Sequence, residues 1–281
     1  MTASSLPLSV RNLTISLPYS GAPRTILQSV HFDVQAGEIL GVVGESGSGK
    51  STLGLACLGL LPALFRVEGD VRLNGNNIRE IAEKKRYRLR GHVVGYVPQE
   101  PMKALNPGMT IEQHVREGLP ASLSKKEKRA RVEYWLSQVG LEGTKHIRQS
   151  YPFALSGGQR QRVLLAAALA AEPEILIADE FTTALDPVTR YQAVELIKKQ
   201  VSQRKMAAIL ISHDLELVAR STDRMLVLRK GVIVESGKTT DVITSPTSRY
   251  MRSLLALSLH FTPREPLSLF PQDSIGDAAD D

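Results

Sequence analysis

The stretch from residue 39 to residue 54 (ILGVVGESGSGKSTLG) restricts the fold of this chain more than any other. Ile39 to Val43 is a short apolar run of strand type, and residues 51 to 61 are rich in Leu and Ala, which suits a helix. Between them, residues 44–51 match the phosphate-loop pattern G-x-x-x-x-G-K-[ST] at every defined position. A glycine loop at a helix start binds anions, because its N–H groups converge and the helix dipole adds positive charge. The stretch therefore predicts a phosphate site after a buried strand.

The residue types within this loop predict separate roles. Glycines leave room for phosphate oxygens against bare backbone, Lys50 would reach the β- and γ-phosphates, and the Ser51 hydroxyl would hold Mg²⁺. The alternative is a flexible Gly/Ser loop, which predicts neither the strand before it nor the helix after it. The residues expected to bind ATP here are Gly44, Glu45, Ser46, Gly47, Ser48, Gly49, Lys50, Ser51 and Thr52. This loop alone does not separate a transporter motor from a kinase or a GTPase.

Length and composition limit the class of protein. A chain of 281 residues with 42% hydrophobic residues can bury the core of one large domain, with or without an appendage. The longest apolar run, residues 163–171, is too short to cross a bilayer of ~30 Å. The first nine residues lack the basic start and apolar core of a secretory signal, so we expect a cytosolic protein. The single cysteine, Cys57, excludes an internal disulfide and is expected to fill space in the core.

The chain is basic, with a net charge of +6 and an isoelectric point near 9.4. Two blocks hold many of the basic residues, KKRYRLR at 84–90 and KKEKRAR at 125–131. We interpret both as solvated helix faces, because such blocks are common on surfaces. Contact with anionic lipid headgroups is the second interpretation, and contact with nucleic acid is a distant third.

The order of patterns along the chain predicts an α/β domain. Alternating or apolar strand patterns occupy residues 8–17, 30–34, 39–43, 69–73, 92–97, 175–178, 207–211, 225–228 and 232–235. Helical patterns occupy residues 51–61, 111–118, 125–139, about 159–171 and 187–204. The N-terminal part is thus β-rich around one helix, and a helical insert follows. The last part, with Pro263, Pro266 and Pro271 and a run of aspartates, is expected to be a disordered acidic tail.

Two carboxylates, Asp179 and Glu180, directly follow the apolar strand at 175–178. Asp179 is expected to hold Mg²⁺ beside Ser51, and Glu180 to polarise the water that attacks the γ-phosphate. The alternative is a pair of acids that only cap a helix. The phosphate loop upstream favours the chemical roles.

A second glycine motif, LSGGQRQR at residues 155–162, lies between the phosphate loop and the acidic strand end. A helix that begins after Ser156, Gly157 and Gly158 offers backbone N–H groups to a phosphate, while the alternative is a plain helix cap by Ser156. In this position the motif resembles the signature of ATP-binding cassette (ABC) ATPases. The resemblance covers about residues 8–240.

Other markers of that family have counterparts here. Gln99 occupies the position of the family's glutamine loop, residues 184–186 (ALD) resemble its dimer-contact loop, and His213 resembles its switch histidine, although a lone histidine after a strand is more often structural. The resemblance implies that Lys50, Glu180 and His213 are catalytic and that Ser51, Gln99 and Asp179 hold Mg²⁺. It also implies that Ser156, Gly157, Gly158 and Gln159 cap ATP held by a second subunit.

The resemblance further implies a phosphate-loop NTPase fold of the ABC cassette type. The cassette would span residues 1–240, with a mainly parallel core sheet, an antiparallel N-terminal part and a helical subdomain at about 100–172. Residues 241–281 would form a C-terminal extension.

Within the family, the chain is most similar to the importer branch for peptides and nickel, on the segments GESGSGKST, VPQEPMKALNP, YPFALSGGQRQRV and SPTSRY. The implied partners are two transmembrane permeases, a second ATPase subunit and, indirectly, a solute-binding protein, with no nucleic acid. A paralogous heterodimer is favoured and a homodimer stays open. The implied location is the cytoplasmic face of the inner membrane, as a peripheral protein. Peptides, nickel and metal chelates all stay open as cargo.

Three positions depart from the family pattern. Phe181 stands where the family usually has proline after the catalytic glutamate, and we expect activity to survive. The residue expected to stack on adenine lies near Leu17, which is not aromatic, so Tyr19 is the substitute. Some relatives carry a four-cysteine iron–sulfur site, which a chain with only Cys57 cannot form.

Two other functions are weighed against transport. ABC ATPases that act on DNA or ribosomes carry long coiled coils, zinc cysteines or two cassettes, and this sequence has none of these. A cassette that does not hydrolyse ATP would not need Lys50, Glu180 and His213 together.

Overall fold

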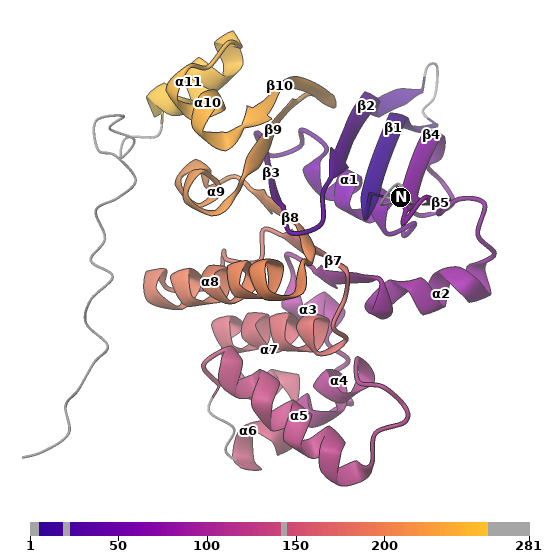
Figure 1. The fold of residues 1–281 in the computed structure, drawn as a ribbon, viewed down its shortest axis with the longest axis vertical. Coiled ribbons are helices and arrows are strands. Elements are labelled where there is room, and N and C mark those ends of the chain that lie inside the picture. Colours follow the sequence, from indigo (N-terminus) through magenta and orange to yellow (C-terminus); the bar gives the residue numbers. More distant parts are fainter. Residues whose placement is uncertain (1–5, 19–22, 142–144, 258–281) are drawn as a thin grey trace, which may run out of the picture.

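The computed structural model describes residues 6–18, 23–141 and 145–257. Two sheets and a group of helices make up this part of the chain (Figure 1). The first sheet is antiparallel, with strand order β2-β1-β4-β5. Its strands are β1 (Leu8–Leu17), β2 (Arg24–Val34), β4 (Arg66–Leu73) and β5 (Asn76–Asn77).

The second sheet has six strands in the order β10-β9-β3-β8-β7-β6, and only β10 runs antiparallel to its neighbour. Its strands are β3 (Ile39–Val43), β6 (Val94–Val97), β7 (Ile175–Asp179), β8 (Ala207–Ser212), β9 (Arg224–Arg229) and β10 (Val232–Lys238). Strands β3, β7 and β8 are buried along their whole length. Continuous apolar strands of this kind belong to the centre of a parallel sheet.

Alternation along β7 divides the interior into two cores. Leu176 and Ala178 belong to a core that includes the helical region, whereas Ile175 and Ile177 belong to a core shared with the antiparallel sheet. Successive side chains of a strand point to opposite faces, so one strand serves both cores. The carboxyl end of β7 is thereby fixed from two sides.

The helices follow from capping residues and from apolar spacing. Thr110, Ser124 and Ser156 each begin a helix with a reciprocal capping box, in which the third residue of the helix is Gln or Glu. The helices before the signature motif are α1 (Lys50–Cys57), α2 (Glu83–His92), α3 (Pro101–Ala104), α4 (Ile111–Glu117), α5 (Lys125–Gln138), α6 (Lys145–Gln149) and the 3₁₀ turn η1 (Pro152–Ala154). Those that follow are α7 (Gly157–Ala170), α8 (Pro187–Arg204), α9 (Leu215–Ser221), α10 (Thr239–Thr244) and α11 (Arg249–Leu257).

The predicted α/β fold, with its parallel core, antiparallel N-terminal sheet and helical region, is confirmed. The strand expected at residues 92–97 begins only at Val94, because His92 still belongs to α2 and the backbone turns at Gly91 with a φ of 92°. Cys57 is buried in α1, and burial raises its pKa to about 12, so it acts as an apolar filler. The predicted acidic tail lies outside the described residues.

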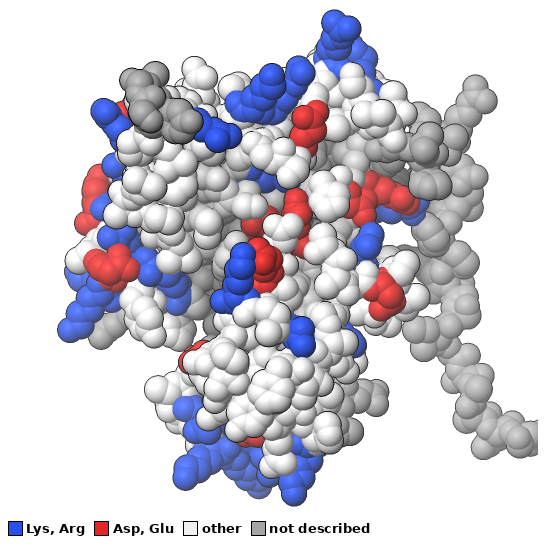
Figure 2. All heavy atoms as spheres, turned by 180° about the vertical axis from the view of Figure 1, so that it is seen from behind, with Lys and Arg blue, Asp and Glu red and all other residues white. Residues whose placement is uncertain are grey.

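The two basic blocks lie on helices α2 and α5, and several of their arginines are paired with acids. Arg86 and Arg90 contact Glu83 at 2.9 and 3.0 Å, while Arg129 contacts Glu133 at 3.2 Å. Figure 2 shows Lys and Arg side chains gathered at the lower end of the molecule, where Figure 1 has α5. This pairing supports the interpretation as solvated helix faces. None of the helices in the described ranges combines the length and apolar character needed for crossing a bilayer.

The C-terminal helices α10 and α11 extend from the β9–β10 hairpin (Figure 1) and share a third core with β3, β9 and α9. Glu235 of β10 anchors this region, because its carboxylate accepts hydrogen bonds from the N–H groups of Thr247 (2.7 Å) and Ser248 (2.9 Å). Ser248 in turn caps α11 by accepting from the Met251 N–H at 3.0 Å. The buried Glu235 therefore fixes the start of α11.

Substitution of Glu235 by Gln should destabilise the fold in a pH-dependent way. Burial opposes ionisation of Glu235, but the hydrogen bonds from Ser248 and Thr247 outweigh it and lower the pKa. A lowered folded pKa stabilises the fold above the unfolded value of about 4.3, and this stabilisation is lost as the pH falls through the folded pKa. Urea unfolding of Glu235→Gln at pH 7 should show a loss of about 1.5–3 kcal/mol, the range for hydrogen bonds to charged groups.

The difference from the natural chain should shrink as the pH falls through the lowered folded pKa of Glu235, because both side chains are then uncharged. Glu68→Gln is the matched control, since Glu68 pairs with Arg66 at the surface (2.9 Å). Such pairs contribute about 0–1 kcal/mol. A loss at Glu235 no larger than at Glu68, or a loss independent of pH, would contradict the anchor.

Candidate nucleotide-phosphate site

The loop at residues 44–49 joins the carboxyl end of β3 to the first turn of α1. Gly49 is the N-cap of α1 with a left-handed φ of 104°, it offers no side-chain cap, and the first turn of α1 contains no acidic residue. The N–H groups of that turn therefore keep their full positive character. This end of α1 suits an anion.

Two glycines of the loop are required by close packing. A Cβ on Gly44 would lie 2.1 Å from the backbone oxygen of Leu228, and a Cβ on Gly49 would lie 2.6 Å from Leu27 Cδ2. The loop is thus pressed against β9 on one side and β2 on the other. Side chains at these two positions would displace it.

Lys50 points back over the loop and is 4% exposed. Its Nζ donates to the carbonyl oxygens of Gly44 (2.7 Å) and Glu45 (3.0 Å) and lies 3.8 Å from Glu180 Oε1. Burial lowers the pKa of Lys50, while Glu180 and Asp179 act in the opposite direction. A cation at this place can meet phosphate oxygens held by the loop.

Asp179 ends β7 and is almost entirely buried, with 2% exposure. Its Oδ2 accepts a hydrogen bond from the Tyr96 hydroxyl at 3.4 Å, whereas Oδ1 is buried without a partner among the described residues. Burial raises the pKa of Asp179, and a hydrogen bond with the Ser51 hydroxyl is the largest of the effects that lower it. A buried carboxylate oxygen without a partner is a candidate metal ligand, because burying it unpaired is otherwise costly.

Glu180 gathers three other predicted site residues around its carboxylate. Gln99 Nε2 donates a hydrogen bond to Glu180 Oε2 at 2.7 Å. Glu180 Oε1 lies 3.4 Å from His213 Nδ1 and 3.8 Å from Lys50 Nζ. The Glu180 backbone has a φ of +44°, in the left-handed region, and its N–H donates to the Ile211 carbonyl at 2.9 Å. Such a backbone costs a residue with a side chain about 1–3 kcal/mol.

The donor set fits Mg²⁺ bound together with a triphosphate. Mg²⁺ uses one or two protein carboxylates or hydroxyls plus phosphate oxygens rather than a full protein cage. Within the described ranges, no group of three or more His, Cys, Asp or Glu residues is arranged for a metal, so Asp179 and Ser51 would share the ion with the substrate. Gln99 could contribute only its carbonyl oxygen, because Mg²⁺ takes oxygen ligands, and its amide nitrogen donates to Glu180.

The signature residues lie apart from this group. Ser156 and Gly157 are exposed at the start of α7, and the Ser156 hydroxyl accepts from the Gln159 N–H at 3.2 Å. Gly158 packs beside the contact-loop segment, since a Cβ there would lie 3.0 Å from the Ala184 oxygen. Within the described part of the chain, no hydrogen bond or ion pair joins these residues to Lys50 or Glu180. Their role toward a second subunit stays a prediction.

Phe181 and Tyr19 are two of the positions that depart from the family pattern. Phe181 is buried in the core that includes the helical region, so a ring fills space directly after Glu180. Tyr19, the substitute for adenine stacking, lies outside the described residues. Residues 184–186 lead into α8, where Asp186 caps the helix by accepting from Val188 N–H (3.1 Å) and Thr189 N–H (3.0 Å).

Sequence analysis missed Tyr96, whose hydroxyl donates to Asp179. Burial raises its pKa, so the hydroxyl stays a donor. The sequence does contain a clue to this contact. Tyr96 lies near the end of the strand that leads to Gln99, and this strand pairs in parallel with the strand that ends at Asp179, so their carboxyl ends lie at the same edge of the sheet.

Comparisons with known proteins place these residues in a family. The family model described as "ABC transporter" matches residues 27–183. The peptidoglycan transport ATP-binding protein YejF of Agrobacterium fabrum is 41% identical over 89% of this chain and 46% of its own length. The dipeptide transport ATP-binding protein DppD of Escherichia coli is 37% identical over 94% of this chain and 82% of its own length. The chain spans less than half of YejF and 41% of the similar oligopeptide transport ATP-binding protein OppD of Mycobacterium tuberculosis.

Solved structures agree in fold. A dimeric, post-hydrolysis state of an ATP-binding cassette bound to ADP and Pi has a TM-score of 0.74 at 27% identity, covering 83% of this chain and 98% of that one. The cbiO1 subunit of an ABC transporter complex from Clostridium perfringens has a TM-score of 0.70 at 26% identity, covering 91% of this chain and 96% of that one.

Substitution of Gly49 by Ala should weaken triphosphate binding. A left-handed backbone with a Cβ costs about 1–2 kcal/mol, and the contact with Leu27 adds to it. We expect an affinity for Mg·ATP that is lower by about tenfold, measured by calorimetric titration.

Gly108→Ala is the matched control for the loss of a glycine, because the nearest atom to its Cβ is Asn106 Oδ1, at 3.4 Å. Equal affinity in Gly49→Ala and Gly108→Ala would show that the packed loop is not the phosphate site.

Proposed function

We propose, from the premise that this chain belongs to the ABC transporter family, that it hydrolyses ATP to energise an importer for peptides. The observation that carries this proposal is the convergence of Gln99, His213 and Lys50 on Glu180, beside the loop at 44–49. A loop that only bound phosphate would not need a carboxylate held by three polar groups. The names of the relatives, which concern oligopeptide, dipeptide and peptidoglycan transport, support a role in the transport of peptides.

Each residue of the site has a separate role in ATP hydrolysis. The loop amides and Lys50 hold the β- and γ-phosphates, Glu180 accepts the proton of the attacking water, and His213 orients that water at the γ-phosphate. Gln99 keeps Glu180 in place until the substrate is bound. Mg²⁺, when bound to Ser51, Asp179 and Gln99, neutralises the phosphate charge that develops in the transition state.

A second ATPase subunit completes each site in this proposal. Ser156 and Gly157 are exposed at the start of a helix of 14 residues, which suits a phosphate held by a partner's loop. The similar cassette with ADP and Pi is described as a dimer, and this supports the arrangement. We infer that ATP binding closes the dimer, that hydrolysis opens it, and that a paralogous heterodimer is more consistent with the importer branch than a homodimer.

The remaining partners follow from the same proposal. The chain would work as a peripheral protein at the cytoplasmic face of the inner membrane. Two permease subunits would contact the helical region near Gln99, and the closing and opening of the ATPase dimer would be transmitted to them there. A solute-binding protein would act on the other side of the membrane. The names of the relatives support peptides as cargo more directly than nickel or metal chelates. They give no support to an ATPase that acts on DNA or ribosomes.

Replacement of Glu180 by Gln should separate binding from turnover. The amide keeps the size of the side chain but cannot accept the proton of the attacking water, so we expect hydrolysis to fall by about 10²- to 10⁴-fold. Binding of Mg·ATP should persist, and size-exclusion chromatography with ATP should detect a trapped dimer.

Glu195→Gln serves as the control, since Glu195 pairs with Lys198 on α8 (2.9 Å) and touches no site residue named above. Normal turnover in Glu180→Gln would refute the role of Glu180 while leaving ATP binding intact.

A further inference from the structure

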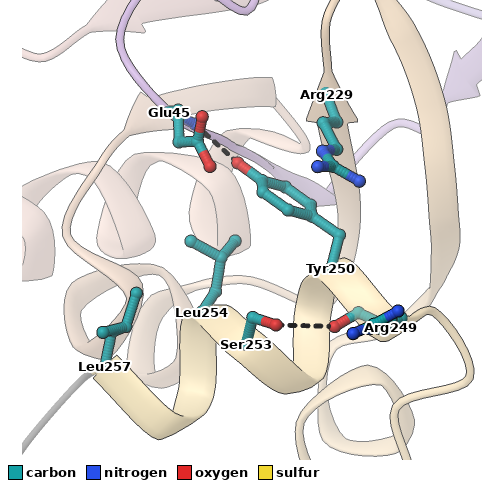
Figure 3. A pocket seen from close by; sticks show the side chains of 7 residues that line it. All are labelled: Glu45, Arg229, Arg249, Tyr250, Ser253, Leu254 and Leu257. Atoms are coloured by element: carbon teal, nitrogen blue, oxygen red, sulfur yellow. Dashed lines mark hydrogen bonds between the residues drawn. The ribbon is translucent and has the colours of Figure 1, made fainter.

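The C-terminal helix α11 contacts the phosphate loop through one side chain. Tyr250 is buried, with 6% exposure, and its hydroxyl accepts a hydrogen bond from the backbone N–H of Glu45 at 3.0 Å. The two residues are 205 positions apart in the sequence. Figure 3 shows the Tyr250 ring reaching from α11 toward Glu45, with Arg229 of β9 beside it. The extension of the chain thus touches the nucleotide site directly.

The position of the Tyr250 ring is fixed on several sides. The guanidinium carbon of Arg229 lies 4.8 Å from the ring centroid, a cation–π contact. Tyr250 also belongs to the third core, with Val43, Val218 and Met251. Burial raises the pKa of Tyr250, so the hydroxyl stays neutral. A hydroxyl held in this way can fix the group to which it is bonded.

That group is the peptide unit between Gly44 and Glu45. The N–H of Glu45 is bonded to Tyr250, and the carbonyl oxygen of Gly44, on the same peptide unit, accepts from Lys50 Nζ at 2.7 Å. The N–H and C=O of a trans peptide lie in one plane and point in opposite directions. A rotation of this plane would therefore move the oxygen that holds Lys50. Tyr250 and Lys50 are connected through a single rigid unit.

Glu235 fixes the other end of this connection. Its carboxylate binds the N–H groups of Thr247 and Ser248, just before α11 begins at Arg249. Tyr250 is the second residue of that helix. The placement of the tyrosine thus depends on a buried acid in β10, and the series runs from Glu235 through Tyr250 to Lys50.

We propose that Tyr250 is a positioning residue of the nucleotide site: through the Gly44–Glu45 peptide it orients the phosphate loop and Lys50 for the triphosphate, and Glu235 holds it in place. The C-terminal extension thereby sets the affinity for ATP. This inference rests on the proposed function, because it assumes that the loop binds ATP. A net hydrogen bond contributes about 0.5–1.5 kcal/mol, so loss of the hydroxyl should weaken Mg·ATP binding by about three- to tenfold.

The test uses the full chain with Tyr250→Phe, which removes the hydroxyl and keeps the ring. Titration with Mg²⁺ and a non-hydrolysable ATP analogue should give a three- to tenfold higher Kd, and the KM for ATP should rise while kcat at saturating ATP stays within twofold. Tyr87→Phe is the matched control, because Tyr87 is 76% exposed on α2. Thermal unfolding without nucleotide checks that both variants are folded, and a general loss of structure would lower kcat as well.

Glu235→Gln provides the second arm through a double-mutant cycle. Glu235→Gln should also raise the Kd for the ATP analogue. In the double variant it should raise the Kd little beyond that of Tyr250→Phe alone, because Glu235 acts on the phosphate loop through Tyr250. If Tyr250→Phe does not fold, Glu235→Gln alone decides, and unchanged affinity there overturns the proposal. Equal affinity in Tyr250→Phe and Tyr87→Phe, or additive losses in the cycle, would also overturn it. Failure of the natural chain to bind the analogue would instead refute the proposed function.

Discussion

The close fit of the phosphate loop between two sheets is the constraint on which the rest of the site depends. The Ser48 carbonyl accepts from the Gly231 N–H at 2.9 Å, and the Gly231 carbonyl accepts from the Gln28 N–H at 2.9 Å. The hairpin turn after β9 therefore ties the loop to β2 of the antiparallel sheet. Since Gly44 and Gly49 also leave no room for a Cβ, the backbone of the loop is set by its surroundings before any anion arrives. Electrostatic binding is strongest when the donors need no rearrangement.

The strand order of the parallel sheet brings the chemistry to this loop. Strand β8 pairs in parallel with β3 on one side and with β7 on the other, so the carboxyl ends of these three strands lie at one edge of the sheet. The phosphate loop follows β3, Glu180 follows β7 and His213 follows β8. Ligands of open α/β sheets bind outside these ends. Gln99 reaches the same edge after β6, and its bond to Glu180 joins residues 81 positions apart.

Sequence reasoning succeeded where a local pattern determines the structure. The apolar runs before the phosphate loop and before Asp179 identified two central strands, and the Ser-Gly-Gly motif at Ser156 identified the start of α7. The meeting of Gln99 with Glu180 could be expected only from family resemblance, because no local pattern encodes it. The contact of Tyr250 with Glu45 had no such guide: a tyrosine on a short amphipathic helix usually packs in a core, and its partner is a backbone N–H that any residue but proline carries.

The central claim is that Lys50, held over a glycine-lined loop, binds the β- and γ-phosphates of ATP. The most direct test compares equilibrium binding of Mg·ATP and AMP to the natural chain and to Lys50→Ala. Hydrogen bonds to charged groups contribute about 1.5–3 kcal/mol, so the variant should lose about ten- to a hundredfold in affinity for Mg·ATP, and its affinity for AMP, which lacks both phosphates, should change little. Retention of Mg·ATP by Lys50→Ala at the natural affinity, or an equal loss for AMP, would contradict the account.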